Sequence, residues 1–309
     1  MRSLKNVDWV GILLFMPSAV CLLAPFTMAG IVFDWNSTEA IVLLVVGIVG
    51  LVLLGVHQRW FAGKNPMFRA SLFSQWVTVC GYLGLCVFGV CVNMIFYYLV
   101  VFWSGVRGYG AVLTRVALLP ETFSLPLSAI LCGLAMRKTG RLDWPMFVGW
   151  PLASASIGLL WFLDAHTPIP ILILINIGVG LGAGTVSPAL QLIILRTTNP
   201  RDNGHSMAMG WLFRSAGMCL GIAIGTVVFT VQMDNHLSRL NVPKTTGETF
   251  LRALMDGMDN SAGRQVIVDT LRILWMICCA LSGVAGILCC SCKYPRLERT
   301  GSSSINEGS

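Results

Sequence analysis

Eight long apolar runs, separated by shorter polar connections, dominate this chain. A helix needs about 20 mainly apolar residues to cross the hydrocarbon core of a bilayer. Backbone groups cannot stay unpaired against lipid, so runs of this kind are expected to be helices. We predict eight transmembrane helices, over residues 9–29, 39–56, 77–103, 111–136, 145–163, 169–195, 206–231 and 271–292.

The composition agrees with a chain that is surrounded by lipid. Hydrophobic residues make up 55% and charged residues 11% of the 309 residues, and the mean hydropathy is +0.75. Soluble domains carry about 25% charged residues, so this chain could not cover its own surface in water. The net charge of +7 does not indicate nucleic-acid binding, because the basic residues lie between the apolar runs. The expected fold class is an all-α integral membrane protein.

Lysines and arginines concentrate on one side of the predicted bundle. They recur before the first run and after the second, fourth, sixth and eighth runs, for example at Arg137, Lys138 and Arg141. The short connections after the first, third and fifth runs contain only Arg107. Because short loops rich in Lys and Arg stay in the cytoplasm, we expect both termini to be cytoplasmic.

A long connection, residues 232–270, is expected on the external side. Its segments 248–258 and 265–273 alternate apolar and charged residues with helical spacing, which predicts helices on the membrane surface. Asn36 begins an Asn-Ser-Thr sequon in a short external loop, and we expect this candidate glycosylation site to be unused because it lies close to the membrane. Residues 293–309 form a polar cytoplasmic tail that is expected to be disordered.

Strongly polar residues inside the predicted helices are confined to the third, fourth, sixth and seventh runs: Asn93, Arg115, Glu121, Asn176, Gln191 and Arg214. A charge in the hydrocarbon is costly and marks a functional hypothesis. Helices that face only lipid should lack such residues. These four helices are therefore expected to surround an aqueous path, with Phe96, Tyr97 and Tyr98 as its apolar lining.

Glu121 is the only carboxylate well inside a predicted helix. It is either a group that exchanges protons or binds a cation, or a carboxylate that the cavity solvates beside a helix kink at Pro120 and Pro126. Arg115 lies about 240° away around the helix, so no ion pair between Arg115 and Glu121 is expected. Arg214 is either a substrate contact or a side chain that extends to the nearer interface or positions neighbouring backbone.

Glycines repeat on two of the four polar runs. Gly217, Gly221 and Gly225 are spaced by four residues on one face of the seventh run. The sixth run carries a glycine at every second position from Gly178 to Gly184. Small residues at such spacing allow close helix packing and also make a helix easier to bend. Their presence on two polar runs favours a bundle that moves.

No cluster of residues indicates catalysis or metal binding. The four histidines lie in connections or at the ends of runs, and no metalloprotease, hydrolase or P-loop motif is present. Cys289 and Cys292 lack a second pair or a histidine at metal-site spacing. Together with Cys290 they are candidates for S-palmitoylation, whereas cysteines within the runs are expected to be packing residues. We expect no enzyme, no metal and no cofactor.

A series of short motifs covers nearly the whole chain. They are residues 7–15, 29–30 with 33–35, 66–67, 72–73, 97–99 and 118–120, then Gly133-xxx-Arg137-Lys138-Thr139-Gly140-Arg141 and Arg214-xx-Gly217-xxx-Gly221, followed by Ile224 and residues 228–229. In their order and spacing these motifs resemble the major facilitator superfamily. More specifically, the chain looks like the fungal 14-helix drug:proton antiporters, which include toxin and secondary-metabolite efflux pumps.

The resemblance implies that residues 1–71 hold two central linker helices and a cytoplasmic loop. Residues 72–292 would be a C-terminal bundle of six helices, built from two inverted three-helix repeats. Four of its helices would line a central cavity, and these are the runs that hold the polar residues. Glu121 departs from the family pattern, which has apolar or small residues after Leu-Leu-Pro, so no family role is assigned to it.

The function that the resemblance implies is proton-coupled export of small hydrophobic organic compounds across the plasma membrane. The energy source would be the proton gradient. The six N-terminal helices of the family are absent from this sequence, and alternating access needs two bundles, so we expect the chain to be inactive by itself. Two alternatives stay open: a facilitator or importer of another solute, and a non-transporting membrane protein that assembles with or regulates another transporter.

Overall fold

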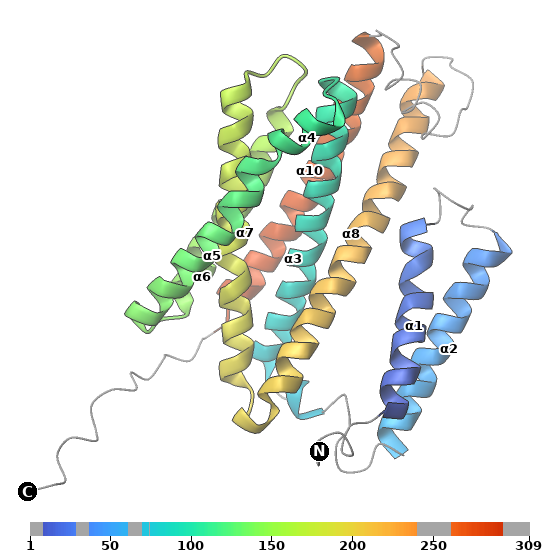
Figure 1. Cartoon of the computed structure of the whole chain (residues 1–309), viewed down its shortest axis with the longest axis vertical. Coiled ribbons are helices and arrows are strands. Elements are labelled where there is room, and N and C mark those ends of the chain that lie inside the picture. Colours follow the sequence, from blue (N-terminus) through green and yellow to red (C-terminus); the bar gives the residue numbers. More distant parts are fainter. Residues whose placement is uncertain (1–8, 29–36, 61–69, 74, 240–260, 293–309) are drawn as a thin grey trace, which may run out of the picture.

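The structure, a computed structural model, describes residues 9–28, 37–60, 70–73, 75–239 and 261–292. Every regular element among these residues is helical, as expected for the all-α class, and Figure 1 shows the long helices side by side. The long helices are α1 (Trp9–Met28), α2 (Thr38–Trp60), α3 (Trp76–Val101), α5 (Leu119–Thr139), α6 (Asp143–Leu159), α7 (Ile169–Thr197), α8 (Asn203–Arg239) and α10 (Ser261–Cys290). The shorter elements are α4 (Ala111–Ala117), a π-helical turn (Phe102–Val106) and 3₁₀ turns at Ala70–Phe73, Leu160–Phe162 and Pro200–Asp202.

Each of the eight predicted runs is helical in the described part of the chain, although not every helix has the predicted length. Seven helical segments there are long and apolar enough to cross a membrane. One of them, Ala111–Thr139, combines α4 and α5. The qualifying part of α1, Val10–Pro25, is shorter than a full crossing segment.

The fourth predicted helix is divided into α4 and α5 at Leu118. The cause is Pro120, which has no N–H to donate and whose ring excludes the carbonyl group four residues earlier. The Leu118 N–H instead bonds the Arg115 carbonyl at 3.2 Å, a tighter turn than the α-helix makes. Pro126 lies inside α5 without ending it. The kink expected at these prolines is therefore a break before Pro120.

Residues 265–273, predicted to lie on the membrane surface, are instead part of α10. Their apolar positions Ile267 and Leu271 are buried in the same cluster as Trp275, so the helical periodicity marks a face that packs against the bundle. α8 likewise continues to Arg239, which makes the predicted connection 232–270 helical at both ends. The predictions for residues 248–258, the tail 293–309 and Asn36 fall outside the described residues.

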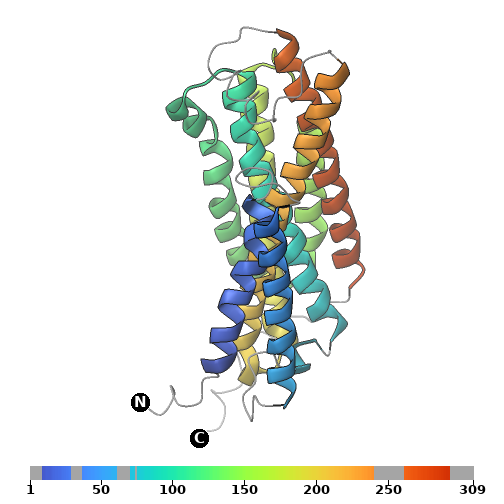
Figure 2. The same ribbon diagram turned by 90° about the vertical axis from the view of Figure 1, so that its right-hand side faces the viewer.

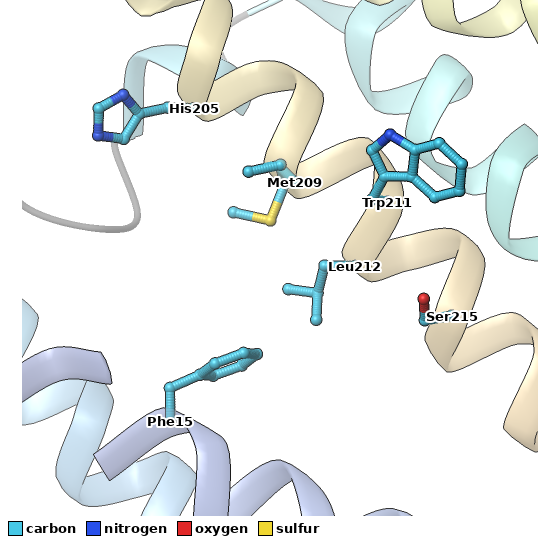
Figure 3. Close-up of a pocket in the computed structure, with 7 residues that line it drawn as sticks. Phe15, His205, Met209, Trp211, Leu212 and Ser215 are labelled. Carbon is cyan, nitrogen blue, oxygen red and sulfur yellow. The ribbon is translucent and has the colours of Figure 1, made fainter. Parts of the chain in front are cut away.

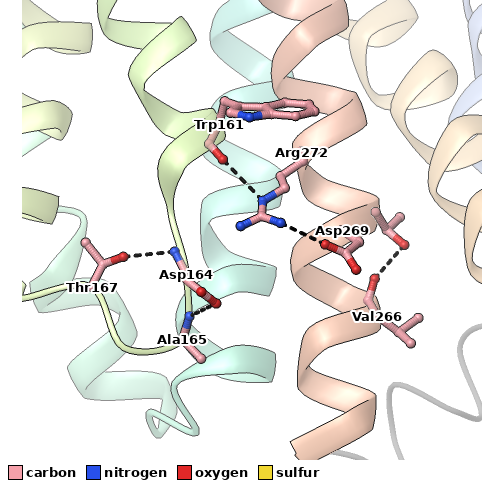
Figure 4. A network of polar contacts seen from close by, with 8 residues as sticks. Trp161, Asp164, Ala165, Thr167, Val266, Asp269 and Arg272 are labelled. Carbon is pink, nitrogen blue, oxygen red and sulfur yellow. Dashed lines mark hydrogen bonds and ion pairs between the residues drawn. The ribbon is translucent and has the colours of Figure 1, made fainter.

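A polar network fastens α10 to the connection between α6 and α7 (Figure 4). Arg272 donates from Nε to the Trp161 carbonyl at 3.2 Å and pairs with Asp269 at 2.9 Å. Within the connection, the Asp164 N–H donates to Thr167 Oγ1 at 2.9 Å. Arg107, which follows the π-helical turn, donates to the Thr167 carbonyl. This network lies at one end of the bundle.

The opposite end carries exposed basic residues, and we call it the basic end: Arg137, Lys138, Arg141 and Arg196. Gly140 ends α5 there in a left-handed conformation with a φ of 67°, and its N–H bonds the Met136 carbonyl. Glycine adopts this conformation without the steric penalty that a Cβ brings. α5, α7 and α10 all end on this side.

The helices from α3 to α10 form one bundle whose packing repeats itself. α3 packs most closely against α8, and α5 against α7. α6 packs against α7, and α10 against α3. If α3, α4–α5 and α6 are matched in order with α7, α8 and α10, each of these contacts has a counterpart in the other half. The packing is therefore that of two inverted three-helix repeats.

α1 and α2 pack against each other and reach the bundle through α1, which contacts α8. Figures 1 and 2 both show the pair beside the α8 face of the bundle. Gly47 and Gly50 of α2 face Leu22 and Ser18 of α1, so the two helices approach closely. The pair and the bundle are thus two packed groups joined along one helix.

Candidate functional site

Apart from Arg115 on α4, the polar residues predicted from the sequence lie on two closely packed helix pairs. Asn93, Tyr97 and Tyr98 belong to α3 and Arg214 to α8, which form the first pair. Glu121 of α5 and Asn176 and Gln191 of α7 belong to the second pair. We call the contact within the first pair the α3–α8 seam and the contact within the second pair the α5–α7 seam.

Backbone approaches backbone along the α3–α8 seam. A Cβ at Gly221 would lie 2.5 Å from the Val90 carbonyl oxygen, and a Cβ at Gly217 would overlap the Cys86 carbonyl oxygen. From the other side, a Cβ at Gly89 would overlap the carbonyl oxygen of Arg214. The glycine series of the seventh run therefore serves close packing, the use that small residues have in membrane helices.

Asn93 takes part in this seam and is partly buried. Its Nδ2 donates a hydrogen bond of 2.8 Å to the Met218 carbonyl on α8. A bond between a side-chain amide and a backbone carbonyl is a common link between membrane helices. The structure therefore gives Asn93 a role in holding α3 to α8.

The two tyrosines of α3 face different surroundings. Tyr98 is buried, and its ring lies against Gly225 and 5.5 Å from the ring of Phe229. Tyr97 is 42% exposed and touches Tyr98 edge to face, with 5.1 Å between ring centroids. Tyr97 is thus available to line a path, whereas Tyr98 is part of the packed interior.

The α5–α7 seam combines glycines with serines. A Cβ at Gly180 would overlap Ser124 Oγ, and a Cβ at Gly184 would overlap Ser128 Oγ. Ser128 also bonds the Gly180 carbonyl at 3.3 Å. Gly178 and Gly182 instead face α6, so the glycines of α7 serve two neighbouring helices.

Glu121 lies inside the α5–α7 seam. Its exposed fraction is 2%, and a Cβ at Gly180 would lie 2.7 Å from its carbonyl oxygen. Its Oε2 is buried and has no hydrogen-bond partner among the described residues. Arg115 is exposed on α4, on the far side of the helix break. No described cation therefore neutralises this carboxyl group.

Asn176 is buried on the same face of α7 as Gly180, one turn away. Its exposed fraction is 1%, and its Nδ2 has no hydrogen-bond partner in the described part of the chain. Unpaired polar atoms at this depth are rare and need an explanation. The seam therefore holds an unpaired acceptor, on Glu121, and an unpaired donor, on Asn176.

Arg214 occupies the space between α3, α7 and α8. Its Cζ lies 5.1 Å from the ring centroid of Phe88 and 5.0 Å from that of Trp211. Nη1 donates to Ser187 Oγ at 3.4 Å, and the buried Nε has no partner among the described residues. The guanidinium is thus partly buried, between the rings of Phe88 and Trp211 and the hydroxyl group of Ser187.

Gln191 completes this region on α7. It lies one turn beyond Ser187 on the same face and is partly buried. Arg214 and Ser187 therefore form a polar contact, and Gln191 lies on the same face of α7 as Ser187. Ser187, Phe88 and Trp211 were not among the residues predicted for the site. Their positions along the chain can be read from the sequence, but the sequence does not show which helices pack together and bring these residues close to Arg214.

Gly133 begins the motif of the basic end, and among the described residues a Cβ added there would meet open space. Arg137 and Arg141 are exposed, and Gly140 forms the turn described above. Among the described residues, no three His, Cys, Asp or Glu side chains could hold a metal together. The described geometry offers packing, polar residues on both seams and a basic surface.

An apolar cavity of about 310 Å³ lies between α1 and α8. Figure 3 shows Phe15 of α1 facing Met209 and Leu212 of α8 across it. His205 and Trp211 also line it. Phe96, Tyr97, Asn93 and Glu121, predicted to line a cavity, are not among its lining residues.

No sequence profile of a protein family matches the chain. The chain is 31% identical over 295 residues to the MFS transporter L2 of Phoma sp., which covers 92% of this chain and 49% of that protein. It is 28% identical over 292 residues to the MFS efflux transporter aclA of Aspergillus oryzae, with coverages of 89% and 52%. The chain spans about half the length of these curated relatives.

A solved structure shares the fold. It is the crystal structure of a bacterial homologue of the human lysosomal transporter Spinster, in an inward-facing and occupied conformation. The TM-score is 0.50 at 15% sequence identity, and the match covers 88% of this chain and 67% of that chain. The helices of this chain are therefore arranged as in a known membrane protein.

Proposed function

Because the chain belongs to the major facilitator superfamily, a family of membrane transporters that are not enzymes, we propose that it is the C-terminal part of a proton-coupled exporter. The substrates would be small hydrophobic organic compounds. The support for export is that relatives matching most of this chain carry names such as efflux transporter. The support for proton coupling comes from the α5–α7 seam.

The observation that carries the proposal is the surroundings of Glu121. This carboxyl group is 2% exposed and has no cation near it in the described part of the chain. A buried carboxylate without a counter-charge is expensive, whereas a protonated carboxyl group also gains a donor. Losing the proton would therefore require the seam around Glu121 to admit water or a cation. Proton binding and a change in packing would then be linked.

Transport needs more than this bundle. Alternating access in this family depends on two bundles that rock about a site near the middle of the membrane. The relatives are about twice as long as the chain, which leaves room for a second bundle. We propose that the polar faces of α3, α5, α7 and α8 turn toward that second bundle. The basic end would face the cytoplasm of a cell with the transporter in its plasma membrane.

The test uses this chain joined to the remaining half of the Phoma relative and reconstituted in vesicles. An imposed pH gradient should accelerate the export of a hydrophobic dye. Glu121→Gln should remove the acceleration while leaving exchange of the dye down its own gradient. Glu39→Gln is the matched control, because Glu39 is an exposed carboxylate at the start of α2.

Two results would count against the proposal. If Glu121→Gln exports the dye with an unchanged response to the gradient, Glu121 is not the proton-binding group. If this chain alone carries dye across the membrane in proportion to a pH gradient, a second bundle is not needed. A facilitator would move the dye at the same rate with and without the gradient.

A further inference from the structure

Arg214 has a charge that no described residue balances. Its partners among the described residues are the hydroxyl group of Ser187 and the rings of Phe88 and Trp211. No described carboxylate forms an ion pair with it. Charged groups within membrane helices are paired or face a water-filled cavity. A counter-charge is therefore missing from the surroundings that the structure describes.

Most N–H groups of the guanidinium have no partner among the described residues. An aromatic ring attracts the positive charge of a guanidinium. The five N–H groups of the guanidinium point outward in its own plane. One of these donors makes a long bond to Ser187, and the buried Nε makes none. The remaining donors suit the two oxygens of a planar anion, which arginine binds in a bidentate way.

Residues around Arg214 and along the adjoining face of α7 could supply the rest of a binding site. Ser187 and Gln191 present a hydroxyl and an amide one turn apart on α7. Phe88 and Trp211 supply apolar surface, and the side chain of Trp211 is 53% exposed. Binding sites for small molecules combine apolar walls with a few placed polar groups. This combination fits an anion that is attached to an apolar body.

We propose that Arg214, Ser187 and Gln191 bind the carboxylate of the transported compound, and that Phe88 and Trp211 pack against its apolar part. The substrate class is then hydrophobic organic acids. This proposal rests on the proposed function, because it names the chemistry of the exported compound. All five residues belong to this chain, so the site can be tested on the chain itself.

The experiment measures binding to the full chain in lipid nanodiscs at neutral pH without a gradient. The probe is radiolabelled naphthalene-2-carboxylate, and the matched probe is the uncharged naphthalene-2-carboxamide. We expect the carboxylate to bind at least about tenfold more tightly, because a charge-assisted bidentate pair is roughly twice as strong as neutral hydrogen bonds. Arg214→Gln should remove this preference, and Arg214→Lys should retain part of it.

Two further variants test the same site in case Arg214→Gln misfolds. Ser187→Ala and Gln191→Leu leave the charge of Arg214 in place and should each weaken carboxylate binding severalfold. Arg115→Gln is the control, because Arg115 is exposed on α4 and should leave both affinities unchanged. Equal affinities for the two probes, or an unchanged preference in Arg214→Gln, would overturn the proposal.

The result can be separated from the proposed function. If the two probes bind equally while the joined transporter still exports a neutral dye with a pH gradient, the anion site is wrong and proton-coupled export stands. Arg214→Gln would then abolish export of neutral and acidic compounds alike, as expected for a counter-charge in the second bundle. If the carboxylate preference is found but export ignores the gradient, the anion site stands and proton coupling is wrong.

Discussion

The α3–α8 seam should not accept a methyl group at Gly221. A Cβ there would lie 2.5 Å from the Val90 carbonyl oxygen, whereas ordinary contact begins at 3.4 Å. α8 would have to move from α3 by about 0.9 Å, which is 3.4 minus 2.5. Such a shift gives up dispersion contacts along both helices. Forced repacking of this kind costs about 1–3 kcal/mol.

The assay is the free energy of unfolding of the chain in mixed micelles, measured for Gly221→Ala and for Gly283→Ala. Gly283 of α10 has open space where its Cβ would lie. Both variants gain the same helix propensity from alanine, about 0.5–1 kcal/mol, so their difference isolates the steric cost at the seam. Adding Gly217→Ala to Gly221→Ala should cost less than the sum of the two, because one displacement relieves both overlaps.

Equal stabilities of Gly221→Ala and Gly283→Ala would refute this reasoning. A fully additive double variant would refute the idea that the helices separate as a unit. It would show instead that each glycine is accommodated by its own local adjustment.

Two smaller effects can be measured in the same way. Asn93→Leu removes the hydrogen bond to the Met218 carbonyl. We expect the free energy of unfolding to fall by about 0.6 kcal/mol, the usual contribution of such a bond between membrane helices. An unchanged free energy of unfolding would argue against a role of Asn93 in holding α3 to α8. Gly140→Ala places a Cβ at a φ of 67° and should lower the free energy of unfolding by about 1–2 kcal/mol. Gly140→Asn should lower it less, because asparagine tolerates the left-handed conformation. Equal losses in the two variants would contradict the backbone strain assigned to this position.

The helices could be predicted from the sequence because apolar length is a local property. The predictions differ from the structure where a tertiary contact, which a local sequence pattern does not contain, decides the outcome. The periodicity of residues 265–273 was correct, but the sequence does not say whether an apolar face meets lipid or Trp275. The break at Leu118 follows from Pro120, yet the sequence alone could not decide between a kink and two helices.

The polar residues were found from the sequence, but their neighbours were not. Asn93 and Glu121 look alike in sequence, since each is a polar residue inside an apolar run. The structure gives the first a bond to Met218 and leaves the second without a partner for Oε2 among the described residues. This difference depends on which helix lies opposite, and helix pairing is a long-range property that spacing along one helix cannot show.

The close approach along the α3–α8 seam has a mechanical consequence. Two helices whose backbones touch at regular intervals cannot slide past each other, and together they resist bending more than either helix alone. Packed interiors of this kind compress little and transmit strain. A displacement of Arg214 would therefore tilt α3 and α8 together. The tilt would reach Tyr98, near Gly225, with little bending of the two helices in between.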